Sequence, residues 1–144
     1  MTRHWQRGLA MAEFAISAPV MFVLLLAVTE LGRAFYQYNQ LVSSARDAAR
    51  YLANKALLGS SGVVSIAATD STAAKYLAVY GNAAGSGSPL LPNLSTGQVT
   101  ITSDASNNVS VSIAYPYQTM FGGRIGSVST AGMTLHAYTS MRAL

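Results

Sequence analysis

The chain has 144 residues, of which 51% are hydrophobic and only 10% charged, well below the roughly 25% of charged residues in an ordinary soluble domain. The net charge of +4 is spread thinly, without a run of Lys or Arg, which argues against a nucleic-acid-binding surface because that function needs a basic patch. Cysteine is absent, which excludes disulfides, a thiolate nucleophile and a zinc–thiolate site.

A short basic segment opens the chain. Residues 1–8 contain Arg3 and Arg7 and lead into a long apolar run. Basic residues at one end of a membrane helix keep that end in the cytoplasm, so we expect the N-terminus inside and the C-terminal part outside. We predict that residues 1–8 form a leader peptide.

The apolar run extends from Leu9 to Val28, 20 residues with a single charge, on Glu13. At about 1.5 Å of rise per residue, a helix of this length matches the roughly 30 Å hydrocarbon core of a bilayer. The sequence therefore predicts a transmembrane helix over residues 9–30, with the lipid bilayer around it. Pro19 lies inside the run and is expected to kink the helix.

Beyond the membrane the helix is predicted to continue over residues 31–58, with Gly59 as its stop signal. Apolar side chains recur there at spacings of four and three residues: Leu31, Phe35, Tyr38, Val42, Ala45, Ala49, Leu52 and Ala56. Such a stripe is buried either against the chain's own C-terminal domain or against a neighbouring subunit, and both alternatives stay open. The small side chains of Ala45 and Ala49 favour close packing in either case.

Two charged residues lie near the expected outer surface of the membrane. Glu30 and Arg33 are three residues apart, so they face each other on a helix. One interpretation is a solvated ion pair that contributes a few tenths of a kcal/mol. The other is a contact between subunits of an assembly.

The remaining residues, 59–144, are predicted to form a small extracytoplasmic domain. A second helix is expected over about 71–80, because Asp70 or Ser71 is a suitable N-cap and Gly81 a suitable stop. The sequence composition then becomes typical of a loop, rich in Gly, Ser, Asn and Pro.

The last third of the chain shows the period-two pattern of strands. Alternation is clear over Val99–Thr102 and Val109–Tyr115, and a third strand is expected within Val128–Met141, whereas Pro116 should end the second strand or place it at an edge. The predicted fold class is α+β. It consists of a long N-terminal helix, a short second helix and a small antiparallel sheet of about three strands that lies against the upper part of the long helix.

A processing signal stands at the start of the apolar run. Gly8, followed five residues later by Glu13, resembles the cleavage site of type IV-like prepilins, in which a peptidase cuts after the glycine. The resemblance implies cleavage between Gly8 and Leu9, so that the mature chain begins at Leu9.

The wider stretch around this signal, from Arg7 to Tyr51, resembles the TadE-like pseudopilins, which are minor pilins of tight-adherence (Flp) pilus and secretion systems. The resemblance implies a pilin-like fold, an inner-membrane location in a bacterium, and a role in surface adhesion or biofilm formation. It implies as partners a prepilin peptidase, other pilin subunits and inner-membrane pilus assembly proteins. The residues expected to pack between helices are Phe14, Pro19, Glu30, Arg33, Phe35, Tyr38, Val42, Ala45 and Ala49.

Glu13 has two interpretations. In low dielectric its carboxylate would pair with the new amine of Leu9, from a neighbour or from its own chain, and would fix the register of packed helices. Alternatively, it is favoured by the dipole at a helix N-terminus.

No catalytic constellation is present. His4 and His136 are far apart, and Asp104 with Asn107 and Asn108 has the spacing of a turn rather than that of a calcium loop. We therefore predict no enzymatic activity, no catalytic residue, no metal and no cofactor. The alternative to a pilin is a single-pass signal-anchor membrane protein whose small extracytoplasmic domain binds a partner.

Overall fold

The computed structural model describes residues 3–58, 64–104, 106–120, 124–125, 128–129 and 132–143, with side chains over 8–56, 64–104, 106–120 and 132–143. The chain divides into two compact units. Unit 1 comprises Met1–Ala34 and Gln118–Gly132, and unit 2 comprises Phe35–Tyr117 and Met133–Leu144. Residues 118–132, which the sequence assigns to the C-terminal domain, are thus grouped with the N-terminal part of the long helix.

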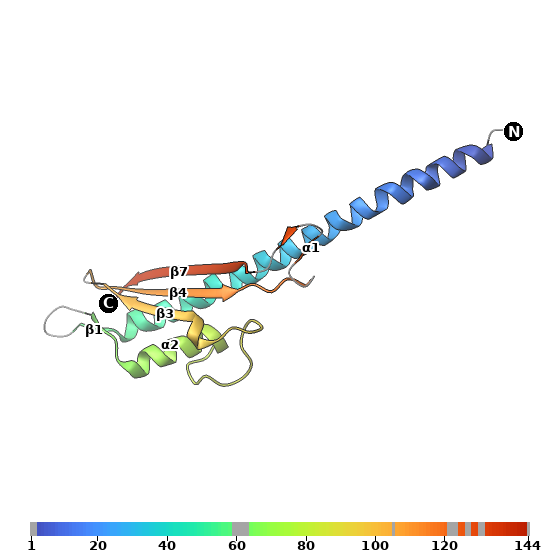
Figure 1. Cartoon of the computed structure of the whole chain (residues 1–144). Coiled ribbons are helices and arrows are strands. Elements are labelled where there is room, and N and C mark those ends of the chain that lie inside the picture. The colour runs from blue at the N-terminus through green and yellow to red at the C-terminus, as the bar shows by residue number, and fades with distance from the viewer. Residues whose placement is uncertain are drawn as a thin grey trace. The chain divides into compact units, whose positions relative to one another are not determined.

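The longest element is α1, Arg3–Lys55, which is helical through Gly8 and Pro19 (Figure 1). It ends three residues before the predicted end at Leu58, so that boundary is wrong. The amide of Ala56 donates to the carbonyl of Leu52 at 2.7 Å and closes the last turn. Strand β1, Leu57–Leu58, then pairs antiparallel with β2, Val64–Ser65, so the backbone groups of these leucines are satisfied by a ladder instead of a helix. Gly59 lies outside the described residues.

The second helix, α2, is Ala68–Tyr80. Its end agrees with the prediction, because Gly81 adopts a left-handed conformation with φ of 74° and its amide donates to the carbonyl of Leu77 at 2.9 Å. Its start does not agree, since Ala67 is the N-cap and makes no side-chain capping bond. Asp70 lies inside the first turn instead, where the helix dipole favours a negative charge without a capping geometry.

The connection after α2 returns across that helix before it enters the sheet. The amide of Leu90 donates to the carbonyl of Val79 at 2.8 Å, and both Leu91 and Leu94 are buried. A short 3-10 helix, η1 (Thr96–Gln98), follows. The Tyr115 hydroxyl donates to the carbonyl of Pro92 at 2.9 Å, so the connection is held to the sheet as well.

Three antiparallel strands in the order β3-β4-β7 form the main sheet. They are β3, Val99–Ser103, β4, Asn108–Pro116, and β7, Thr134–Arg142. In this register Val99 opposes Ile113, and Ile113 opposes Ala137, so the alternating apolar residues share one face. The α+β fold and the three-stranded sheet predicted from the sequence are confirmed.

Unit 2 contains the apolar core. On β4 the side chains of Val109, Val111 and Ile113 are fully buried. In the view of Figure 1 the sheet and the second half of α1 overlap, and both belong to unit 2. That half of α1 has an equally buried face, made largely of alanines: Leu41, Ala45, Ala48, Ala49 and Leu52. Both buried faces belong to unit 2, and their burial stabilises it, since apolar burial contributes about 25 cal/mol per Å².

The stripe predicted on α1 divides into two parts. Ala45 and Ala49 are buried, as are Leu52 and Ala56, so the intramolecular alternative holds for the upper members. The lower members are exposed, by 57% for Leu31, 59% for Phe35 and 41% for Tyr38, and Val42 is half-buried. The buried face passes instead through Gln37 and Ser44, whose polar character hides it from a search for apolar periodicity.

Two further strands, β5 (Arg124–Ile125) and β6 (Val128–Ser129), pair antiparallel within residues 118–132 of unit 1. This segment connects β4 to β7. It leaves the sheet at Tyr117, whose amide donates to the carbonyl of Met133 at 2.9 Å. This backbone bond, just beyond the Pro116–Thr134 pair of the sheet, joins the last residue before the segment to the first residue after it.

Candidate functional site

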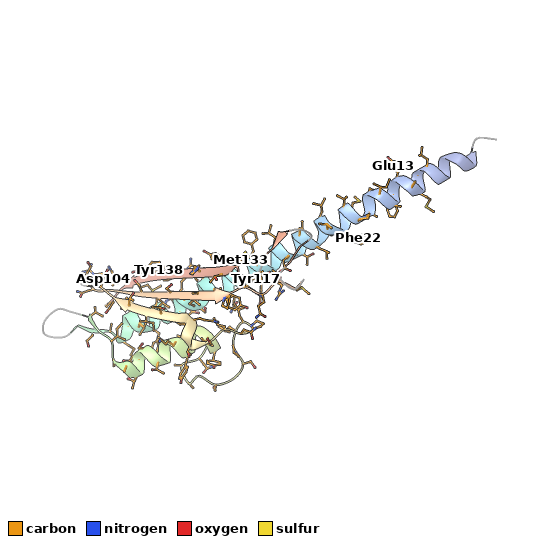
Figure 2. The ribbon with its side chains drawn as sticks, in the orientation of Figure 1. Glu13, Phe22, Asp104, Tyr117, Met133 and Tyr138 are labelled. Carbon is orange, nitrogen blue, oxygen red and sulfur yellow. The ribbon has the colours of Figure 1, made fainter. Side chains whose placement is uncertain are left out.

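The N-terminal part of α1 presents an apolar surface to its surroundings. Over residues 8–55 the helix contains an 18-residue window apolar enough to cross a membrane, and none of that window is buried within the protein. The large exposed side chains include Leu9, Met11, Phe14, Ile16, Val20, Met21, Phe22, Leu24, Leu25 and Val28, and Figure 2 shows Phe22 projecting outward. Among the described side chains of unit 1, none is a buried hydrophobic residue. This surface therefore needs an apolar medium or apolar neighbours.

Two hydroxyl groups within this surface are satisfied by the helix itself. The Ser17 hydroxyl donates to the carbonyl of Phe14 at 3.2 Å, and the Thr29 hydroxyl donates to the carbonyl of Leu25 at 2.9 Å. Such bonding inside the helix is what hydrocarbon requires, because the solvent there offers no partner. These two hydroxyl groups are therefore compatible with a bilayer.

Gly8 stands within the helix and has no packing reason to be glycine. A Cβ built on Gly8 meets no atom within 4 Å, and the residue is exposed. Glycine in a helix interior costs about 1 kcal/mol relative to alanine, so the fold alone favours another residue here. Leu9, the next residue, is 73% exposed, and the bond between the two is open to an approaching protein.

Glu13 lies on the same exposed surface (Figure 2). A shallow depression on the helix surface is lined by Glu13, Ile16, Ser17, Val20 and Met21. No side chain in the described part of the protein pairs with the carboxylate. Before any cleavage, α1 begins at Arg3 and has no acidic residue in its first turn. The helix dipole therefore does not account for Glu13 in this state, since that effect fades beyond the first turn.

Glu30 is the one charged side chain that the structure buries among those it describes, with 5% of its surface exposed. Both carboxylate oxygens accept the backbone amide of Met120, at 3.3 and 3.5 Å, and Oε1 lies 4.0 Å from Nη1 of Arg33. The predicted ion pair forms, but it is not the solvated pair expected, because the carboxylate is buried and bonded to a backbone donor. The structure brings Glu30 and Arg33 together, but within one chain; a contact between subunits remains a prediction.

The contact with Met120 had no sequence signal. The two residues are 90 positions apart, and backbone amides carry no residue-specific pattern that periodicity could detect. A buried acid on a helix is a hint that some partner exists, because burying an unpaired charge is costly. It does not say which segment supplies the donor.

The turn between β3 and β4 is organised by Asp104 (Figure 2). Its carboxylate accepts the amides of Ser106 at 2.7 Å and Asn108 at 3.3 Å, and the Asn108 side-chain amide at 3.4 Å. Hydrogen bonds from the backbone amides of Asn108 and Ser106 lower the pKa of Asp104 below its ordinary value. The turn interpretation fits these bonds, and within the described residues no group of three or more His, Cys, Asp or Glu could hold a metal ion.

A model of the family described as "TadE-like protein" matches residues 8–50. The comparisons with curated proteins and with solved structures find no match. The matched segment begins at Gly8 and includes Glu13, Glu30 and the apolar surface between them, and it stops before the sheet. The predicted resemblance is confirmed for this segment, since residues 8–50 match the TadE-like family model.

Proposed function

We propose that this protein is a minor pilin or pseudopilin of a tight-adherence pilus or secretion apparatus. In this function it is inserted in the bacterial inner membrane through α1 with its N-terminus in the cytoplasm. A prepilin peptidase then cuts it after Gly8, and it joins other pilin subunits and inner-membrane assembly proteins through its N-terminal helix. The protein is the substrate of the peptidase and afterwards a structural component.

The observation that carries this proposal is the TadE-like match that starts at Gly8, on a helix whose apolar surface is exposed. Within that surface, Gly8 has no steric role and Glu13 has no described partner. Processing accounts for a glycine without a steric role, and assembly accounts for an acid that no described side chain pairs. Cleavage after Gly8 creates an amine on Leu9, and an opposite charge in low dielectric favours the ionised form of both groups.

N-terminal sequencing and intact mass of the protein isolated from membranes test the proposal. The expected result is a chain that begins at Leu9 and that co-purifies with a major pilin. A chain that retains residues 1–8 in cells with an active prepilin peptidase would contradict it, and would favour a signal-anchor protein with a small binding domain.

A further inference from the structure

The segment that contacts Glu30 has an unusual combination of neighbours. Gln118–Gly132 belongs to unit 1 together with the apolar part of α1. Met120 donates its amide to Glu30, while its own side chain is 66% exposed. A large apolar side chain is thus held next to the helix without being covered by the described part of the protein.

The position of Glu30 along α1 fixes the level of this contact relative to a membrane. Between Leu9 and Glu30 the helix rises about 32 Å at 1.5 Å per residue, close to the roughly 30 Å thickness of the hydrocarbon core. Glu30 therefore lies at the outer boundary of the bilayer when the apolar surface is immersed. Met120, bonded to it, lies at the same level.

The chemistry of Glu30 supports a capping role for the segment. A carboxylate at the edge of hydrocarbon is costly unless hydrogen bonds satisfy its oxygens. The Met120 amide supplies a donor to both oxygens, and Nη1 of Arg33, three residues further along the helix, lies 4.0 Å from Oε1. The backbone amide of Met120 thus binds the carboxylate of Glu30, while the thioether side chain of Met120 is exposed and suited to an apolar environment.

We propose that Gln118–Met120 is a membrane-interface contact whose backbone caps Glu30 and whose Met120 side chain inserts into the outer interface of the bilayer. This rests on the proposed insertion of α1 in the membrane. Its partner is the lipid surface itself, because the exposed Met120 side chain lies at the same height along α1 as the end of the apolar helix surface, and both belong to unit 1. The contact gives the chain a second anchoring point at the membrane surface, in addition to α1.

Depth-dependent fluorescence quenching of the full chain in vesicles tests this proposal. Because the chain has no cysteine, Met120→Cys carries a single environment-sensitive label. The vesicles contain phosphatidylcholine and phosphatidylglycerol with a nitroxide either near the headgroup or deep in the acyl chains. The label at position 120 should be quenched more strongly by the shallow nitroxide than by the deep one.

Two single-cysteine variants provide the controls. Val20→Cys, at an exposed position in the middle of the apolar surface, should be quenched mainly by the deep nitroxide. Tyr138→Cys lies on the sheet at an exposure of 67%, matched to the 66% of Met120, and should be quenched by neither. Two further substitutions are made in the Met120→Cys chain. Glu30→Ala should reduce quenching by the shallow nitroxide, whereas Glu30→Gln should retain more of it.

Three results overturn the proposal, and they are distinguishable. A label at position 120 that behaves like the one at 138, while position 20 is quenched deeply, refutes the interface contact and leaves membrane insertion intact. Absence of quenching at position 20 refutes insertion of α1, and the interface contact with it. If the label at position 120 is protected from both nitroxides, and this protection disappears when the ratio of lipid to protein is raised, a second copy of the chain covers Met120 instead of lipid.

Discussion

The amide of Met120 lies 3.3 Å from Oε1 of Glu30, so one carboxylate on α1 joins segments that are 90 residues apart. Unit 1 has no buried hydrophobic residue among its described side chains. Among the described residues of unit 1, this polar contact joins the connection between β4 and β7 to the helix. Such contacts are sensitive to a single substitution, because a donor that loses its acceptor keeps its desolvation cost.

Replacement of Glu30 should release this segment. In Glu30→Ala the Met120 amide has no carboxylate acceptor, and we expect its hydrogen exchange to accelerate by about tenfold, equivalent to about 1.4 kcal/mol. Exchange at Ala137, which is buried in the sheet, should stay unchanged. Glu30→Gln keeps an acceptor oxygen and should lie between the two. Unaltered exchange at Met120 in Glu30→Ala would show that other bonds hold the segment.

Processing should depend on Gly8 and not on helical glycine in general. Gly8→Leu and Gly32→Leu both place a side chain where no atom lies within 4 Å, and both should raise helix propensity by up to about 1 kcal/mol. Only Gly8→Leu should block cleavage, because a peptidase that cuts after Gly8 must approach that backbone closely. Mass spectrometry of membrane-isolated protein gives the readout. Equal cleavage in both variants would contradict the assigned site.

Glu13 should matter for assembly but not for insertion. Glu13→Ala removes a charge from an apolar helix, which makes insertion easier, yet it removes the partner for the Leu9 amine. We expect unchanged membrane fractionation and a loss of most filament incorporation. Ser17→Ala is the matched control, because Ser17 lines the same depression and its hydroxyl bonds only to its own helix. Normal filament incorporation by Glu13→Ala would remove the registry role.

The sequence was sufficient for elements whose pattern is local. In β4, alternation from Val109 to Tyr115 marks the buried face because every second residue is apolar, and Gly81 marks the end of α2 because few other residues adopt its conformation. The apolar surface of α1 is equally easy to recognise, because its residues are contiguous in the sequence. These features require only neighbours along the chain.

Tertiary contacts could not be predicted in the same way. Apolar periodicity on α1 selected Phe35 and Tyr38, but these are exposed, whereas polar Gln37 and Ser44 are buried. The partner of a buried face decides which residues it contains, and Ser44 is tolerated because its hydroxyl donates to the carbonyl of Leu41 at 3.0 Å. For the site, the exposure of Gly8 and Glu13 follows from sequence, while the Met120 contact to Glu30 does not.

The buried face of α1 should not accept larger side chains. Ala49 is fully buried between α1 and the rest of the core, so Ala49→Leu should lower the free energy of unfolding by about 1–3 kcal/mol through overpacking. The adjacent Arg50 is exposed, and Arg50→Leu should change stability by no more than about 0.5 kcal/mol. Urea denaturation of the full chain in detergent, followed by circular dichroism, compares them. Equal stability of the two variants would contradict this packing.

Acid should weaken the turn between β3 and β4. Because the pKa of Asp104 is lowered from its ordinary value of 3.8 in the folded protein, its stabilising effect is fully present above that value. The effect is lost as the pH falls through the lower folded-state pKa, when the carboxylate becomes protonated. NMR titration should therefore show the amide signals of Ser106 and Asn108 moving below about pH 4. In Asp104→Asn, which retains an acceptor oxygen but does not titrate, these shifts should disappear, and their persistence would assign the titration to another group.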